Sequence, residues 1–222
     1  MIEEAHRAYN AHDYSQAFTL YKMLAGQDNA DAQTSLGFMY QNAQGTQKDP
    51  DKARFWYEKA ATKKQPFALF NLALLHRDGD QFKAYELFLE AAVLEVPPAQ
   101  YEVALMLERG LGCVQNYAEA AFWYEEAAKR GHAEAFNNLG VLYKEGHGVT
   151  PNMERAVRCF ERASEKNLPT GHYNLGLMYD QGLGVVQDND KALALCRKAA
   201  YGGHSKAKAI IKQLQEEGKT VF

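Results

Sequence analysis

This 222-residue sequence has few cysteines, no large excess of charge of either sign and no long apolar stretch. The three cysteines cannot all pair with one another, and their positions do not repeat in phase, so we expect reduced thiols rather than a disulfide framework. A formal net charge of −3 lacks the basic excess that is typical of nucleic-acid binding. No apolar run approaches the roughly 20 residues that cross a bilayer. These absences predict a protein with no nucleic-acid partner and no membrane span.

Motifs that carry catalysis or bind metal ions are also absent. The sequence holds no His-x-x-x-His or Cys-x-x-Cys pair at ligand spacing and no Gly-x-Ser-x-Gly nucleophile motif. We therefore expect no metal site, no cofactor and no catalytic residue, and we predict that the protein is not an enzyme. A catalytic group assembled from distant parts of the chain is the alternative, and no motif supports it.

The sequence does have an internal repeat of 36 residues. Ala53, Ala156 and Ala192 each follow an Asp or Asn by four residues and precede a pair of small residues by seven. Further alanines in the same frame are Ala17, Ala84 and Ala120. A unit this short cannot bury its apolar face alone, so it must stack on its neighbours. We predict an all-α fold, a right-handed α/α superhelical solenoid of antiparallel helix pairs.

The repeat spacing predicts a single repeat domain over residues 1–222. Within it we expect a partial N-terminal repeat at 1–26, five repeats over 30–204 and a C-terminal capping helix at 205–218. The second of the five repeats is shortened, because Leu72 precedes Ala84 by 12 residues where the other repeats have 17. The connection in that repeat should therefore be tighter than in the others.

Polar and small residues recur at fixed places in the two helices of each repeat, here called helix A and helix B. An Asp or Asn four residues before the repeat alanine can accept a hydrogen bond from the first turn of helix B. These expected caps are Asp13, Asp49, Asp80, Asn116, Asn152 and Asp188. Gly37, Gly140 and Gly176 lie inside helix A, where glycine is unfavourable, so we expect close helix crossings there.

Three Gly-x-Gly sequences follow helix A. They are Gly110-Leu-Gly112, Gly146-His-Gly148 and Gly182-Leu-Gly184. A phosphate-binding loop of this composition would need a strand before the turn, and here a helix precedes it each time. We predict that these glycines end helices with positive φ angles.

These motifs together resemble the SEL-one-like repeat family. The clearest segments are Asn138-Leu-Gly-Val-Leu-Tyr143, Asn174-Leu-Gly-Leu-Met-Tyr179 and Trp123-Tyr-Glu-Glu-Ala-Ala128. The resemblance implies an α/α solenoid related to tetratricopeptide repeats, and it implies non-enzymatic adaptors and scaffolds, in bacteria often linked to the envelope or to host contact. The chain lacks the paired cysteine of the cysteine-rich bacterial members, so their β-lactam chemistry is not implied.

The resemblance also implies that helix A lines the concave side of the solenoid, where a partner would bind. Residues two before or two after the inward-facing leucine or valine of each helix A would then face the partner, and an Asn directly before it could bind a peptide backbone. The predicted partner-binding residues are Phe38, Phe70, Asn71, Leu74, Tyr101, Leu105, Asn137, Asn138, Tyr173 and Asn174. A purely structural role for the asparagines and the leucines is the alternative.

The sequence therefore predicts an adaptor or scaffold that binds a protein or peptide in its concave groove. An envelope or secreted protein that recognises cell-wall or host components is the alternative function. We expect a cytoplasmic location for the sequence as it stands, and a periplasmic or secreted one if a signal peptide has been removed. The segment at 206–219 could instead mediate self-association, and the sequence does not fix the oligomeric state.

Overall fold

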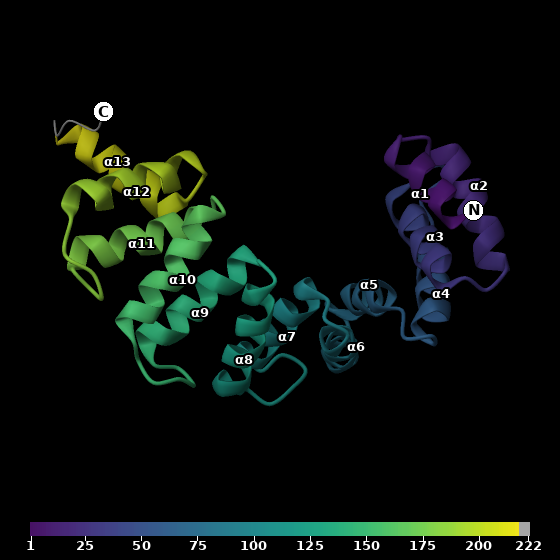
Figure 1. Ribbon diagram of the computed structural model, residues 1–222, viewed down its shortest axis with the longest axis horizontal. Coiled ribbons are helices and arrows are strands. Elements are labelled where there is room, and N and C mark those ends of the chain that lie inside the picture. The colour runs from purple at the N-terminus through teal and green to yellow at the C-terminus, as the bar shows by residue number, and fades with distance from the viewer. Residues whose placement is uncertain (218–222) are drawn as a thin grey trace. The chain divides into compact units, whose positions relative to one another are not determined.

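The computed structural model describes residues 1–217, which form thirteen α-helices and no strand (Figure 1). Their bounds are Ile2–Asn10 (α1), Tyr14–Gly26 (α2), Ala30–Asn42 (α3), Pro50–Ala61 (α4), Pro66–His76 (α5), Gln81–Val93 (α6), Pro97–Arg109 (α7), Tyr117–Lys129 (α8), Ala133–Glu145 (α9), Met153–Glu165 (α10), Pro169–Gln181 (α11), Asn189–Tyr201 (α12) and Ser205–Glu216 (α13). The all-α prediction is confirmed. The expected capping helix is α13, and residues 218 and 219, which the predictions for the C-terminal segment include, lie outside the described part.

The helices group into two compact units, which are considered separately below. Unit 1 comprises residues 1–99 and 111–113, and unit 2 comprises residues 100–110 and the chain from 114 onward. Within unit 1, each helix from α1 to α6 packs against the next one along the chain. Within unit 2 the same holds from α8 to α13, and α9 also contacts α11. This nearest-neighbour packing is what stacked helix pairs require. The single repeat domain over 1–222 stays a prediction.

All six predicted caps are present at the start of helix B. Each Asp or Asn side chain accepts a hydrogen bond from the backbone N–H three residues later, at 2.8–3.2 Å. Asn152, for example, accepts from the N–H of Arg155. A side chain of this kind satisfies one of the amide groups that have no partner inside the helix. The repeated Asp or Asn thus fixes where each helix B begins.

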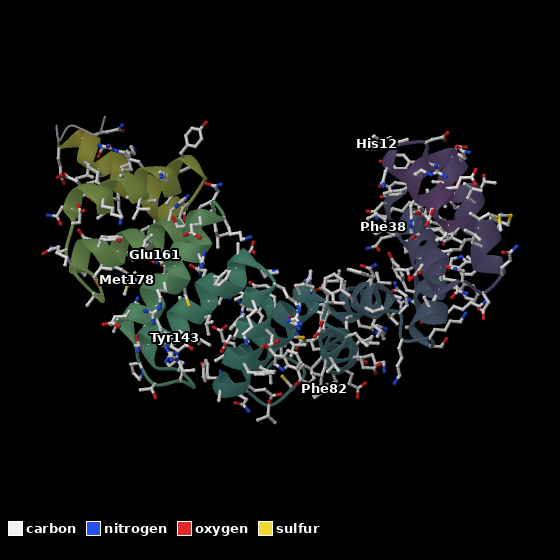
Figure 2. The ribbon with its side chains drawn as sticks, viewed as in Figure 1. His12, Phe38, Phe82, Tyr143, Glu161 and Met178 are labelled. Carbon is white, nitrogen blue, oxygen red and sulfur yellow. The ribbon has the colours of Figure 1, made fainter. Side chains whose placement is uncertain are left out.

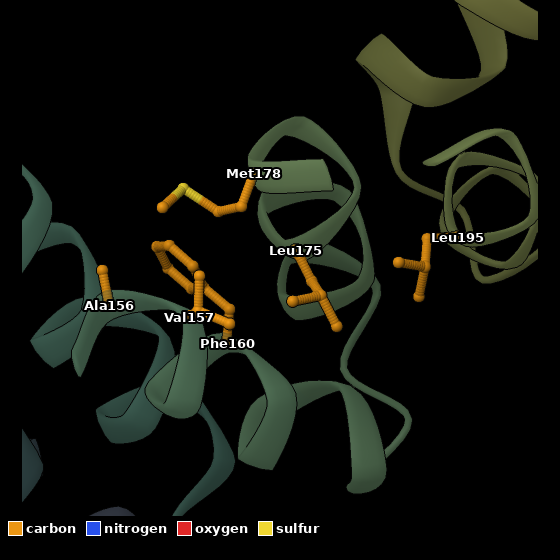
Figure 3. Close-up of a cluster of buried hydrophobic side chains, with 6 residues drawn as sticks. All are labelled: Ala156, Val157, Phe160, Leu175, Met178 and Leu195. Atoms are coloured by element: carbon orange, nitrogen blue, oxygen red, sulfur yellow. The ribbon is translucent and has the colours of Figure 1, made fainter. Parts of the chain in front are cut away.

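The core of unit 2 shows how the helix-A and helix-B patterns meet. Figure 3 shows Val157 and Phe160 of α10 facing Leu175 and Met178 of α11, with Leu195 of α12 on the far side of Leu175. Steps of three residues along α10 and α11 place these side chains on one face of each helix. All five are at most 7% exposed, so they form a continuous apolar layer between successive repeats.

The helix-A glycines mark close approaches between helices. A Cβ atom on Gly140 would lie 2.7 Å from Cε1 of Phe160, and one on Gly37 would lie 2.8 Å from Cδ1 of Tyr57. The expected close crossings are therefore confirmed at these two positions. At Gly176 the nearest atom, the carbonyl oxygen of Ala192, would be 3.3 Å away, so this crossing is looser.

The Gly-x-Gly loops end helix A as predicted, because all six of their glycines have φ between 66° and 76°. The second glycine also has a packing role that the sequence analysis did not anticipate. A Cβ on Gly148 would lie 2.3 Å from the carbonyl carbon of Tyr117, the first residue of helix B in the preceding repeat. Gly45, Gly112 and Gly184 approach the first residues of α2, α6 and α10 in the same way. Each loop therefore lies directly on the repeat before it.

The second repeat lacks this loop, as its shortened spacing predicts. Residues 77–80 alone connect α5 to α6, which leaves no room for an arm that reaches the first turn of α4. On α4, the helix B that is left uncovered, the residue after the repeat alanine Ala53 is the exposed Arg54. The equivalent Ala121 and Val157 are buried in repeats whose helix B is covered. The residue type thus follows the presence or absence of the loop.

Candidate functional site

An aromatic pocket of about 570 Å³ lies in unit 1 among α1, α2, α3 and α5. Its lining comes from both helices of the N-terminal pair and from the helix A of the next two repeats. The lining residues are His6, Tyr9, Tyr21, Asp31, Thr34, Ser35, Phe38, Gln65, Phe67, Phe70 and Asn71. Three of the ten predicted partner-binding residues, Phe38, Phe70 and Asn71, are brought together here.

The walls of the aromatic pocket are apolar and open to solvent. Phe38 on α3, labelled in Figure 2, is 40% exposed, and Phe67 in the first turn of α5 is 55% exposed. Phe70 is half-buried, with its ring centroid 5.6 Å from that of Phe88. Large aromatic side chains that stay exposed beside one another are typical of interaction surfaces.

Polar groups at the rim of the pocket can orient a ligand. Asp31 accepts a hydrogen bond from the Gln65 side chain at 3.3 Å, and the Tyr9 hydroxyl donates to Gln44 at 2.9 Å. Burial raises the pKa of Tyr21, against a smaller opposing effect of its hydrogen bond with Ser35, so its hydroxyl stays protonated. The pocket thus offers an apolar floor, with the Asp31 carboxylate and several uncharged donors and acceptors at its rim.

The remaining predicted residues are spread over other places. Leu74 is half-buried on α5 of unit 1 and does not line the aromatic pocket, and Leu105 is half-buried on α7. Tyr101 stacks on His132 and Tyr173 stacks on His204, with ring centroids 4.5 and 4.3 Å apart. Binding of a partner by these residues stays a prediction.

The two stacked histidines occupy equivalent turns two repeats apart. His204 caps α13, because its Nδ1 accepts a hydrogen bond from the N–H of Ala207 at 3.3 Å, whereas His132 precedes α9 without such a bond. Burial lowers the pKa of both rings. Each histidine, as a neutral ring, therefore packs against a tyrosine on the preceding helix A.

The asparagines of unit 2 form a ladder of hydrogen bonds across three repeats. Asn174 donates to Asn137 at 2.8 Å, Asn137 donates to Asn138 at 3.2 Å, and Asn138 donates to the Tyr124 hydroxyl at 3.1 Å. The Tyr124 hydroxyl in turn donates to the carboxylate of Glu108. These bonds supply the structural role that the sequence analysis gave as the alternative for these asparagines. Their contact with a ligand stays a prediction.

Sequence reasoning missed most of the aromatic pocket. His6, Tyr9 and Tyr21 come from the partial first repeat, whose pattern departs from the others, and Phe67 lies one turn before the predicted inner positions of α5. The available signal was the number of rings within one short stretch, because the first 21 residues contain four histidine or tyrosine rings besides His12.

The described residues were also compared with the requirements of a metal site, a membrane-spanning helix and a reactive thiol. Residues 1–217 contain no group of three or more His, Cys, Asp or Glu side chains placed to hold a metal ion. No helix among them is both long enough and apolar enough to cross a bilayer. Burial raises the pKa of the Cys159 thiol to about 11, so that thiol is protonated at neutral pH and a poor nucleophile.

The observation that decides the family is a match to the Sel1 repeat at residues 11–29, 30–64, 66–92, 97–132, 133–168 and 169–204. These segments cover well over half of the chain. The chain is a Sel1 repeat protein. The resemblance drawn from the sequence is therefore confirmed, and the match extends into the partial first repeat.

Known proteins similar to this Sel1 repeat protein come from yeasts and from bacteria, so a bacterial origin stays a prediction. Chitin synthase regulatory factor 3 of Schizosaccharomyces pombe is 31% identical over 132 residues, which are 55% of this chain and 14% of that protein. The crystal structure of a Sel1 repeat protein from Oxalobacter formigenes matches with a TM-score of 0.91 at 28% identity, covering 97% of this chain and 88% of that one.

A second solved structure, of a protective antigen present in uropathogenic Escherichia coli strains, matches with a TM-score of 0.85 at 29% identity, over 92% of this chain and 45% of that one. The solenoid fold class is thereby confirmed. Sel1 repeat proteins generally mediate protein–protein interactions, and their solenoid is typically a non-enzymatic scaffold. The chain spans only a small part of the length of its yeast relative.

Proposed function

We propose that this Sel1 repeat protein is a non-enzymatic adaptor that binds a segment of a partner protein in the aromatic pocket of unit 1. The observation that carries the proposal is the grouping of the exposed rings of Phe38 and Phe67 with Asn71 in one hollow. Exposed rings that gather in one hollow, unlike rings exposed singly, are typical of a surface that a partner covers.

The lining favours a peptide with an apolar anchor. An aliphatic or aromatic side chain seated between Phe38 and Phe67 would contribute about 1.5–3 kcal/mol by its removal from water. The Asn71 amide, which both donates and accepts, suits the backbone of an extended peptide. A strongly charged ligand would find only Asp31 and His6 as ionisable groups other than phenols in the lining.

The comparison with the yeast relative supports a regulatory rather than a catalytic role, because that protein is named a regulatory factor of chitin synthase. The matched segment is 14% of that protein, so its specific partner is not transferred to this chain. What the similarity supports is the general role of the repeats as a binding scaffold.

The test compares two pocket variants with a matched surface control. Phe38→Ala and Phe67→Ala remove pocket rings, and Phe122→Ala removes a ring of α8 that is equally exposed, at 54%, outside the pocket. Proteins captured from the native organism by the wild type would be identified by mass spectrometry, and each purified partner would then be titrated against all three variants by calorimetry.

We expect the affinity of the partner to fall about tenfold or more for each pocket variant, since tenfold corresponds to about 1.4 kcal/mol, and to stay unchanged for Phe122→Ala. Undiminished binding by Phe38→Ala and Phe67→Ala together would remove the aromatic pocket as the site. Adding Tyr101→Ala and Tyr173→Ala to the series would then test the predicted residues of unit 2.

A second candidate function is recognition of cell-wall or host components by an envelope or secreted protein. It is favoured by the solved structure of the protective antigen from uropathogenic Escherichia coli. The two candidates differ in location. Fractionation of native cells, with the protein detected by antibody, should find it in the cytoplasm for an adaptor and in the periplasm or the medium for the second candidate.

A further inference from the structure

A second hollow, the arginine groove, lies in unit 2 between α8 and α10 with α9 as its floor. Its volume is about 590 Å³. The lining residues are Glu125, Phe136, Leu139, Tyr143, Arg155, Arg158, Cys159, Glu161, Arg162 and Glu165. It is formed by the helix-B side of two neighbouring repeats, and it shares no residue with the aromatic pocket.

Three arginines follow one stripe of α10. Arg155, Arg158 and Arg162 are three and four residues apart, a spacing that places their side chains on the same face of a helix. Arg162 pairs with Glu165 at 3.1 Å. Within the described residues neither Arg155 nor Arg158 has a carboxylate within 4 Å, although both side chains are exposed. Two guanidinium groups therefore face the groove without an acidic partner.

The side chain of Arg155 is held in one orientation by the Tyr143 ring. The guanidinium of Arg155 lies 5.4 Å from the centre of the Tyr143 ring and donates a hydrogen bond to its hydroxyl at 3.4 Å. Figure 2 labels Tyr143 on α9, the floor of the groove, and Glu161 on α10, one of its walls. An arginine held against a ring loses less freedom when it binds a planar anion.

The acidic residues of the groove leave it with a positive excess at the Arg155 end. Glu125, on the opposite wall, pairs with Lys129 at 3.3 Å, and Glu165 pairs with Arg162. Glu161 lies one turn beyond Arg158, toward the C-terminus of α10, and places a negative charge there. A ligand should therefore carry its acidic group near Arg155 and Arg158, although the whole chain has a net charge of −3.

An apolar floor lies beneath these charges. Leu139 is buried, Phe136 is half-buried, and the thiol of Cys159 also lines the groove. Exposed ion pairs alone add little affinity, so a ligand that binds here must also cover this floor. The combination fits an Asp or Glu followed or preceded by an aliphatic or aromatic residue.

We infer that the arginine groove binds an acidic peptide segment of a partner protein, with its carboxylate on Arg155 and Arg158 and a neighbouring apolar side chain on Phe136 and Leu139. Arginine binds carboxylates through two parallel hydrogen bonds, which gives orientation as well as attraction. The site is independent of the aromatic pocket, so the same chain would hold two partner segments, one apolar and one acidic.

The experiment uses a random peptide library displayed on phage, selected against the full-length protein. Parallel selections use the double variant Arg155→Glu/Arg158→Glu, which reverses two exposed charges, and the control Lys206→Glu/Lys208→Glu, which makes the same change in net charge on exposed residues of α13. Circular dichroism and melting curves confirm that all three proteins fold. Enriched peptides are then synthesised and titrated at low and high salt.

We expect peptides with an Asp or Glu beside an apolar residue to be enriched on the wild type and on the control, and to lose about tenfold or more in affinity on the arginine variant. Their affinity should also fall as salt is raised. Phe38→Ala/Phe67→Ala should leave their binding unchanged, which separates this site from the proposed function. A library with no acidic enrichment, or acidic peptides that bind the arginine variant equally well, would overturn the inference.

Discussion

Single residues decide how closely the helices approach, and the two glycines of α11 show the range. A Cβ on Gly171 would lie 2.6 Å from the Ala163 Cβ and 2.9 Å from the Ala163 carbonyl carbon. A Cβ on Gly176 would meet nothing closer than 3.3 Å. Backbone atoms of a packed helix cannot move aside as a long side chain can, so the first glycine is required and the second is tolerated.

The substitutions Gly171→Ala and Gly176→Ala should therefore act in opposite directions. We expect the first to lower the free energy of unfolding by roughly 1–3 kcal/mol through overpacking. The second should be neutral or stabilising by up to about 1 kcal/mol, because alanine is the better helix former. Urea unfolding followed by circular dichroism measures both, and equal effects would contradict the difference in their surroundings.

Three histidines, of which His172 is buried and His132 and His204 are half-buried, give the stability of the molecule a pH dependence whose sign can be predicted. Burial lowers the pKa of His132, His172 and His204 in the folded chain, so the folded state favours the neutral rings. Their contribution is present above the unfolded pKa of about 6.5 and is lost as pH falls below it, because only the unfolded chain then gains the protons readily. The carboxylates whose pKa is lowered, such as Asp28 and Asp49, titrate at more acidic pH.

We expect the melting temperature to fall by about 2–4 °C for each kcal/mol lost when pH is lowered from about 7.5 to 5. The fall should be smaller in the variant His132→Gln/His204→Gln, even though that variant loses two ring stacks. Differential scanning fluorimetry across this pH range is sufficient. A fall of the same size in the variant would assign the pH dependence to other groups.

Pairs of helices are tied together by polar contacts as well as by the apolar core. The asparagine ladder runs from Asn174 on α11 through Asn137 and Asn138 on α9 to Tyr124 on α8. Asn71 occupies the place of Asn138 and Asn174 in its own repeat, yet it lines the aromatic pocket. The same residue type at the same position therefore serves packing in unit 2 and is available to a partner in unit 1.

Alanine at these two places should separate the roles. Asn137→Ala removes the acceptor of Asn174 and the donor to Asn138, so we expect a loss of about 1–2 kcal/mol and faster amide exchange in α9 and α11. Asn71→Ala should leave exchange in α9 and α11 unchanged and should weaken partner binding in the aromatic pocket. Hydrogen exchange with mass spectrometry reads out both variants. Unchanged exchange in Asn137→Ala would mean that the ladder adds nothing to stability.

The parts of the structure that the sequence predicts well are those set by local chemistry. Asp49 and Asn152 cap helices because a short acceptor before a first turn needs no distant partner. Ala43 escaped prediction because it takes φ of 56° where the other loops use glycine. The asparagine ladder and the aromatic pocket could not be predicted, because they depend on how α9 meets α11 and on how α1 meets α5 through intervening helices. Residue types alone do not fix those registers.

For the molecule as a whole, repeats that contact only their neighbours should respond locally to a partner. Occupation of the aromatic pocket should slow amide exchange in α1, α3 and α5 and leave α9 to α12 unchanged, because coupling decays from one repeat to the next. Exchange measured with and without a purified partner tests this. Uniform protection of every helix would instead indicate all-or-none coupling along the chain.

The loops that lie on the preceding helix B all point the same way along the chain, so the repeats overlap in one direction. The loop of each such repeat covers the first turn of helix B in the repeat before it, as Gly148 covers Tyr117. Removing repeats from the C-terminal side would therefore expose the first turn of the last remaining helix B, whereas removing them from the N-terminal side would leave those first turns covered. Among the described helices from α2 to α10, α4 is the one helix B whose first turn no such loop covers, and the exposed Arg54 is the polar side chain that the sequence places there.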